Sequence, residues 1–245
     1  MATQMAGRVR WSAERRFYFG MALAMFAVVY IGFARSFFLR PLFPGFPSPA
    51  EPIFYVHGAV FTSWMVLLVA QPLLVASGRM DLHRALGRFG AVIAAAIVVL
   101  GIMGARVAAQ RPTGFINVPI PPLQFLTIPL FNMLVFGTLI TLAILKRHDA
   151  QAHKRLMLLA TVNLLAAAFA RWPFEFAKGG PPVYFALSDL FIVALVAWDF
   201  SSRGRLHPVT LWAGLATIVA QPLTLMVAGT EPWLAFARWL VGVPG

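Results

Sequence analysis

The stretch FYFGMALAMFAVVYIGFARSFF, which occupies Phe17–Phe38, decides the fold class because Arg35 is its only charged residue. A helix that crosses the hydrocarbon core of a bilayer needs about 20 predominantly apolar residues. Six more stretches of this kind follow along the chain. The seven predicted spans are Phe17–Phe38, Ile53–Ala76, Phe89–Ala108, Leu123–Leu145, Leu156–Trp172, Val183–Asp199 and Val209–Ala228. The sequence therefore predicts an all-α polytopic membrane protein, a bundle of seven transmembrane helices that forms one domain over residues 1–245.

The composition supports the same class. Hydrophobic residues make up 60% of the chain and charged residues 11%, whereas soluble domains average about 45–50% and about 25%. Strands of a membrane barrel would alternate with a period of two, and these stretches do not. The chain has no cysteine, which excludes disulfides, thiolate metal sites and cysteine nucleophiles.

The basic residues predict the orientation, because cytoplasmic loops are rich in Lys and Arg. Thirteen of the 20 Lys and Arg residues fall on the side that also holds the amino terminus. They are Arg8, Arg10, Arg15, Arg16, Arg79, Arg84, Arg88, Lys146, Arg147, Lys154, Arg155, Arg203 and Arg205. We therefore expect the amino terminus inside the cell and the carboxy terminus outside. The net charge of +12 is then explained by topology. Anionic lipid headgroups are sufficient partners for these basic residues, and we expect no nucleic-acid binding.

The last residues, 230–245, are apolar but too short to span a bilayer. Trp233, Arg238 and Trp239 in this segment suit a helix that lies in the outer membrane interface.

One phrase occurs twice, as VAQPLLVASG at Val69–Gly78 and as VAQPLTLMVAG at Val219–Gly229. A proline inside a span frees a carbonyl one turn back, and the amides of Gln71 and Gln221 could bond to such a group. An inverted repeat of the kind found in transporters and chance similarity both remain open.

Four of the five histidines lie in the predicted cytoplasmic layer: His83, His148, His153 and His207. Imidazole is the commonest metal ligand, and three histidines with an open position form a catalytic zinc geometry. These residues are therefore candidate ligands for zinc, copper or iron. Three aspartates could be further ligands or could orient the rings: Asp81, Asp149 and Asp199. The alternative is that each histidine caps a helix or contacts a lipid phosphate.

A second candidate site lies near the outer side, where His57, Asn132, Arg171 and Asp189 fall within or at the ends of predicted spans. Ionisable groups at such depth are costly and usually face a bundle interior. We expect these four to line a pocket, with Asp189 in contact with Arg171 or His57. The alternative is an Asp189–Arg171 ion pair that only fixes helix register. Haem iron bound to His57 would have an open axial position or a second axial ligand other than histidine, because the outer layer has no second histidine.

The runs DLHRALG at Asp81–Gly87 and HKRLMLLATVNLLAAAFAR at His153–Arg171 resemble an uncharacterised bacterial family of multi-pass membrane proteins. That family carries a His-Arg-x-Leu-Gly turn and a later His-Lys/Arg-Arg-x-Met segment that ends in Ala-x-x-x-Arg. The resemblance covers the second to sixth spans. It implies a helical bundle in the bacterial inner membrane. His83, His153 and Arg171 match the pattern, and no activity comes with it.

Three function classes follow from these patterns. The first is a membrane protein that binds a small molecule or cofactor, either a transition metal or haem, among polar residues in the bundle, with a redox-linked role as one version. The second is a non-catalytic accessory subunit of a larger membrane complex, and the third is a small-solute transporter. Whether the protein is an enzyme stays open.

Overall fold

The computed structural model describes residues 11–116 and 118–242, and within these ranges every regular element is a helix. The longer elements are α1 (Ala13–Phe33), α2 (Pro52–Ala76), α3 (Met80–Ala109), α5 (Thr127–Leu145), α6 (Ala150–Phe169), α7 (Pro181–Arg203), α8 (Pro208–Val227) and α9 (Glu231–Val241). Shorter elements are α4 (Pro122–Phe125), a π-helical turn η1 (Ala34–Phe38), and the 3₁₀ turns η2 (Arg40–Leu42) and η3 (Glu175–Ala177). The prediction of an all-helical protein is confirmed for these residues.

Six helical segments are long and apolar enough to cross a membrane. They are Ala13–Phe38, Pro52–Ala76, Met80–Ala109, Pro122–Leu145, Pro181–Arg203 and Pro208–Val227. Their exposed faces carry large apolar side chains, such as Val92 on α3 and Met226 on α8, which suits contact with lipid rather than with water. The chain is therefore a multi-pass membrane protein.

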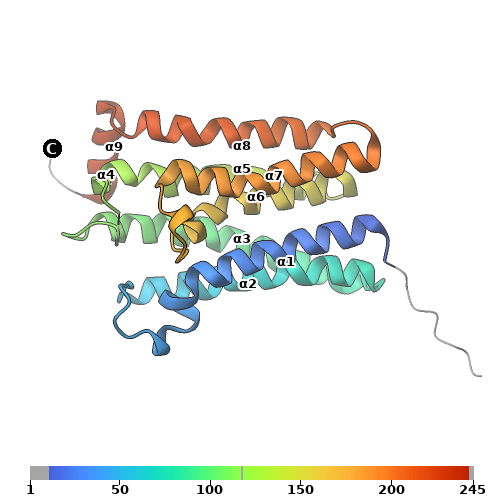
Figure 1. Ribbon diagram of the computed structural model, residues 1–245, viewed down its shortest axis with the longest axis horizontal. Coiled ribbons are helices and arrows are strands. Elements are labelled where there is room, and N and C mark those ends of the chain that lie inside the picture. Colours follow the sequence, from blue (N-terminus) through green and yellow to red (C-terminus); the bar gives the residue numbers. More distant parts are fainter. Residues whose placement is uncertain (1–10, 117, 243–245) are drawn as a thin grey trace, which may run out of the picture.

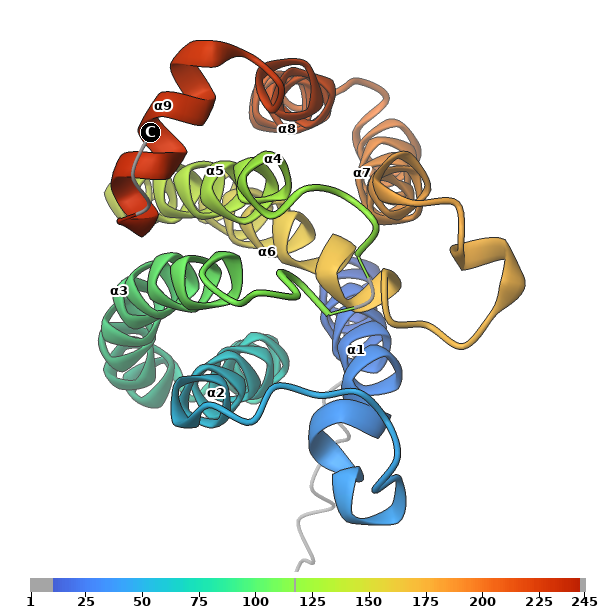
Figure 2. The same ribbon diagram turned by 90° about the vertical axis from the view of Figure 1, so that its left-hand side faces the viewer.

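The predicted fifth span corresponds to α6, which is not one of these six segments. Its first turns carry Lys154 and Arg155, and 14 of its 20 residues are buried. It packs against α1, α5, α7 and α8, while α2 packs between α1 and α3 (Figure 2). A helix enclosed by other helices touches little lipid, so it can carry polar groups that a lipid-facing helix cannot.

The helices run along the long axis of the bundle and create two unlike ends (Figure 1). The short α2–α3, α5–α6 and α7–α8 turns form one end, which we name the basic end because it holds most of the Lys and Arg residues assigned above to the cytoplasmic side. Of these residues, Arg8 and Arg10 lie outside the described residues. The longer α1–α2, α3–α4 and α6–α7 connections form the other end, named the loop end.

Helix α9 lies across the loop end (Figures 1 and 2). The Trp233 Nε1 group donates to the Leu123 carbonyl at 2.8 Å, and the Gln110 side chain donates to the Val241 carbonyl at 2.6 Å. Trp239 is 74% exposed on the opposite face. This arrangement fits the predicted interfacial segment over 230–245, of which residues 243–245 lie outside the described residues.

Candidate functional site

The most deeply buried charges are Arg155 on α6 and Asp199 on α7, whose side chains are both 0% exposed. Two guanidinium nitrogens, Nε and Nη2, donate to the same carboxylate oxygen, Oδ1, with Nε at 3.2 Å. The second carboxylate oxygen accepts the backbone N–H of His207 at 3.0 Å. Desolvating two charges is expensive and is offset only when the pair is close and its other hydrogen-bonding groups are used. Both carboxylate oxygens of Asp199 accept hydrogen bonds here, so the pair links α6 to α7.

Further polar groups extend this pair to α1. The Arg155 Nη1 group donates to the Gln151 side chain at 2.6 Å, and the Gln151 amide donates to Glu14 at 3.1 Å. Lys154 forms an ion pair with the same Glu14 carboxylate. We call Glu14, Gln151, Lys154, Arg155 and Asp199 the ion-pair network, which runs from the buried Arg155–Asp199 pair to the partly exposed Glu14. It holds two positive and two negative charges, so its net charge is zero.

Two hydroxyl groups beside this network are buried without a hydrogen-bond partner, Tyr18 Oη and Thr210 Oγ1. The Tyr18 ring lies 4.6 Å from the Lys154 ammonium and 5.9 Å from the Arg155 guanidinium carbon, within the range of cation–π attraction. The network therefore connects α1, α6 and α7 at the basic end, next to the start of α8.

The predicted cytoplasmic histidines do not converge in the structure. His207 caps α8, because its Nδ1 accepts the Val209 N–H at 3.1 Å. His153 Nδ1 lies 2.8 Å from the Ala143 carbonyl, and His148 is exposed. His83 is half-buried, and its Nδ1 has no partner. Within residues 11–116 and 118–242, no three His, Cys, Asp or Glu side chains are grouped in a way that could hold a metal ion.

Helix capping also accounts for two titratable groups at this end. The Asp149 carboxylate accepts the Gln151 and Ala152 N–H groups at 3.0 Å each, and the Ala152 bond in particular lowers the pKa of Asp149. Burial lowers the pKa of His207, and the neighbouring charges of Arg155 and Arg203 lower it further. Both shifts keep these groups in the form that can accept a backbone N–H, which is the form that caps a helix.

Three of the four residues of the predicted outer set contact separate partners in the described residues. Asp189 accepts a hydrogen bond from the Gln221 amide on α8 at 2.8 Å, and its contact with Arg171 or His57, directly or through water, stays a prediction. Arg171 bonds to the Ala167 carbonyl at 2.6 Å and lies 4.8 Å from the centre of the Phe33 ring. Asn132 is half-buried on α5.

His57 on α2, like His83 on α3, has a buried Nδ1 without a hydrogen-bond partner. The imidazole stacks on Phe61 with ring centres 4.1 Å apart and planes at 20°. Nδ1 is buried without a partner and faces α3 at Gly104, where a β-carbon would lie 3.8 Å away. The backbone of Leu100 on α3 also lies near this ring. Within the described residues, none of the four predicted outer residues is hydrogen-bonded to another.

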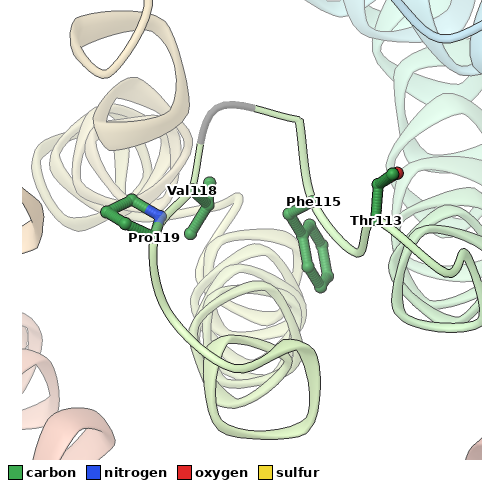
Figure 3. Close-up of a pocket in the computed structure, with 4 residues that line it drawn as sticks. All are labelled: Thr113, Phe115, Val118 and Pro119. Carbon is green, nitrogen blue, oxygen red and sulfur yellow. The ribbon is translucent and has the colours of Figure 1, made fainter.

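Two open hollows occur at the loop end. One, of about 520 Å³, is lined by Thr113, Phe115, Val118 and Pro119 in the α3–α4 connection (Figure 3). The other, of about 500 Å³, is lined by Phe37, Arg40, Pro41, Pro44 and Tyr55. Neither has a histidine in its lining.

Sequence reasoning missed the Arg155–Asp199 pair as a site. The sequence assigns Arg155 to membrane orientation, and it offers Asp199 as a metal ligand or as a residue that orients one. A usable signal was present: Asp199 follows the apolar run of α7 and Arg155 opens the apolar run of α6, so both fall where lone charges need a partner.

Comparison of the chain with models of protein families, with curated proteins and with solved structures finds no match.

Proposed function

We propose that the chain spans the bacterial inner membrane seven times, with the basic end in the cytoplasm. In this proposal α6 crosses the membrane as the fifth span in chain order, in addition to the six apolar segments. The support is the excess of Lys and Arg at the basic end and the parallel course of α6 beside the six apolar helices (Figure 1). An odd number of spans then places α9 at the periplasmic surface.

Fusions to alkaline phosphatase, which is active only outside the cytoplasm, test this topology. A fusion after α9 should be active, and a fusion in the α5–α6 turn at Arg147 should be inactive. The opposite pattern would overturn the orientation. Equal activity after Leu145 and after Phe169 would show that α6 does not cross the membrane.

We infer that the protein binds a small molecule or cofactor within the bundle, with His57 as a contact residue. The observation that carries this proposal is the buried, unpartnered Nδ1 of His57. Buried polar atoms are nearly always hydrogen-bonded, and an exception calls for an explanation such as a bound group. Leaving such an atom unpaired costs about 1–3 kcal/mol.

The surroundings of His57 limit what the bound group is. The Phe61 ring stacks against the imidazole, and Phe54 lies beside Gly104, so the group has an apolar body. Neutral imidazole offers one donor and one acceptor, so the group also has a polar atom for Nδ1. A small aromatic or quinone-like ligand with one polar atom meets these conditions.

His57→Gln tests this proposal. We expect the wild-type protein, purified in mild detergent, to carry a small molecule that organic extraction releases, and the variant to retain less than about a tenth of it, since losing one buried hydrogen bond of about 1.5 kcal/mol lowers affinity about tenfold. An absorption spectrum identifies haem or another chromophore directly. The matched control is His148→Gln, because His148 is exposed.

Equal loss in both variants, or full retention in His57→Gln, would contradict the role of His57. A wild-type protein that carries no molecule would favour the accessory-subunit alternative.

A further inference from the structure

The positive charges at the loop end fall into two groups. Three have a carboxylate partner within the described residues: Arg111 with Glu51, Lys178 with Glu175 and Arg238 with Glu231. The Arg111–Glu51 pair is bidentate, and its hydrogen bonds hold the pKa of Glu51 below the usual value. Among residues 11–116 and 118–242, these three glutamates are the only carboxylates in the connections and α9 at this end, and none of them pairs with the remaining cations.

Arg40 is one of these remaining cations, and it lies in the wall of the 500 Å³ hollow. Its guanidinium contacts the Tyr55 hydroxyl, bonds to the Pro49 carbonyl at 3.5 Å and lies 5.2 Å from the centre of the Tyr55 ring. A guanidinium has five N–H donors, and these contacts use only the Nη1 nitrogen. The contacts therefore fix the position of Arg40 and leave most of its donors for another group.

Two more arginines without a carboxylate partner lie in or beside the same connection. Arg35, in the π-helical turn η1, donates from Nη2 to the backbone carbonyl of Arg171 at 3.3 Å and lies 4.4 Å from the centre of the Phe46 ring. Arg171 lies two residues after the end of α6. Turns of π-helix occur frequently at functional sites. The α1–α2 connection and the end of α6 thus carry three cations that no described carboxylate neutralises.

The lining of the hollow is otherwise apolar, with Phe37, Pro41 and Pro44 beside Tyr55. Leu42 in the same connection is 72% exposed. This connection follows a membrane-spanning segment directly, so the hollow lies at the level where lipid headgroups meet hydrocarbon. Tyrosine is enriched at membrane–water interfaces, and an arginine guanidinium binds phosphate through charge-assisted hydrogen bonds.

We propose that this hollow binds the phosphate of an anionic membrane phospholipid, with Arg40 as the main contact, Tyr55 as the residue that positions it, and Arg35 and Arg171 as flanking charges. The apolar lining takes the glycerol and the upper acyl region. The occupant is a lipid rather than a soluble phosphate because only a lipid uses both the cation and the apolar wall. This site is separate from the proposed His57 contact, and either proposal can fail without the other.

Native mass spectrometry of the full-length protein in detergent, with added phosphatidylglycerol or phosphatidylcholine, tests the site. We expect wild-type protein to hold phosphatidylglycerol in preference, and Arg40→Gln to weaken that binding about tenfold, which corresponds to about 1.4 kcal/mol. Tyr55→Phe should give a smaller loss, and Arg40→Lys, which keeps the charge, an intermediate one. The matched control is Arg106→Gln, because Arg106 is exposed at the same end and outside the lining.

Equal weakening in Arg40→Gln and Arg106→Gln would overturn the site, because it would show general charge attraction. Equal affinity for the two lipids would overturn it as well. Competition by inorganic phosphate at concentrations similar to those of the lipid would show that the occupant is a soluble anion and would contradict the proposal. Thermal unfolding without added lipid shows whether each variant is folded before its binding is compared.

Discussion

Asp199→Ala is expected to lower the free energy of unfolding by about 3–5 kcal/mol, since removing one partner of a buried ion pair leaves an uncompensated charge. Arg155 would keep its bonds to Gln151 but lose both bonds to the carboxylate, and the His207 N–H would also lose its acceptor. Unfolding of the purified protein in detergent, monitored by circular dichroism against denaturant, measures the loss.

The matched control is Asp81→Ala, whose carboxylate is 74% exposed and 3.8 Å from Arg79. An exposed pair of this kind contributes about 0–1 kcal/mol. The double variant Arg155→Leu with Asp199→Leu should be less destabilised than Asp199→Ala alone, because it removes both charges. A loss for Asp199→Ala no greater than that for Asp81→Ala would show that the ion pair does not hold α6 to α7.

Gly32→Ala is expected to destabilise the bundle by about 1–3 kcal/mol through overpacking. A β-carbon at position 32 would collide with the backbone of Ala168 on α6, and backbone atoms cannot rotate away as a flexible side chain can. One turn earlier, the Val28 carbonyl accepts the Trp172 Nε1–H at 3.1 Å, so separating the helices would also lengthen that bond.

Gly20→Ala, on the same helix, is the control because a β-carbon there meets nothing within 4 Å. Alanine favours a helix over glycine by about 1 kcal/mol, so this variant should be neutral or stabilised. If both variants have the same effect, the close approach of α1 and α6 at Gly32 is not present in the protein.

Much of the helical layout could be predicted from the sequence, because crossing a bilayer requires long apolar runs. The predicted span Ile53–Ala76 matches α2 within one residue, and Leu123–Leu145 covers α5 with the short α4 before it. The predicted span Phe89–Ala108 differs more, because α3 already begins at Met80. Hydropathy detects only the part of a helix that meets hydrocarbon, and a helix can continue beyond it into a basic turn.

The candidate sites were harder to predict, because hydropathy says nothing about which helices are neighbours. Arg155 and Asp199 are separated by 44 positions, and only the packing of α6 against α7 brings them together. Gln221 was expected to bond a carbonyl freed by Pro222, but its amide donates to Asp189 instead. The estimated depth of Asp189 pointed to Arg171 and His57, yet the adjacent helix α8 supplies a hydrogen-bond partner.

The most direct test of the ligand-binding account is native mass spectrometry of the wild-type protein released from nanodiscs. We predict a population heavier than the bare chain by the mass of one small molecule, which is absent from His57→Gln and present in His148→Gln. A wild-type spectrum that contains only the bare chain and lipid adducts would contradict the account.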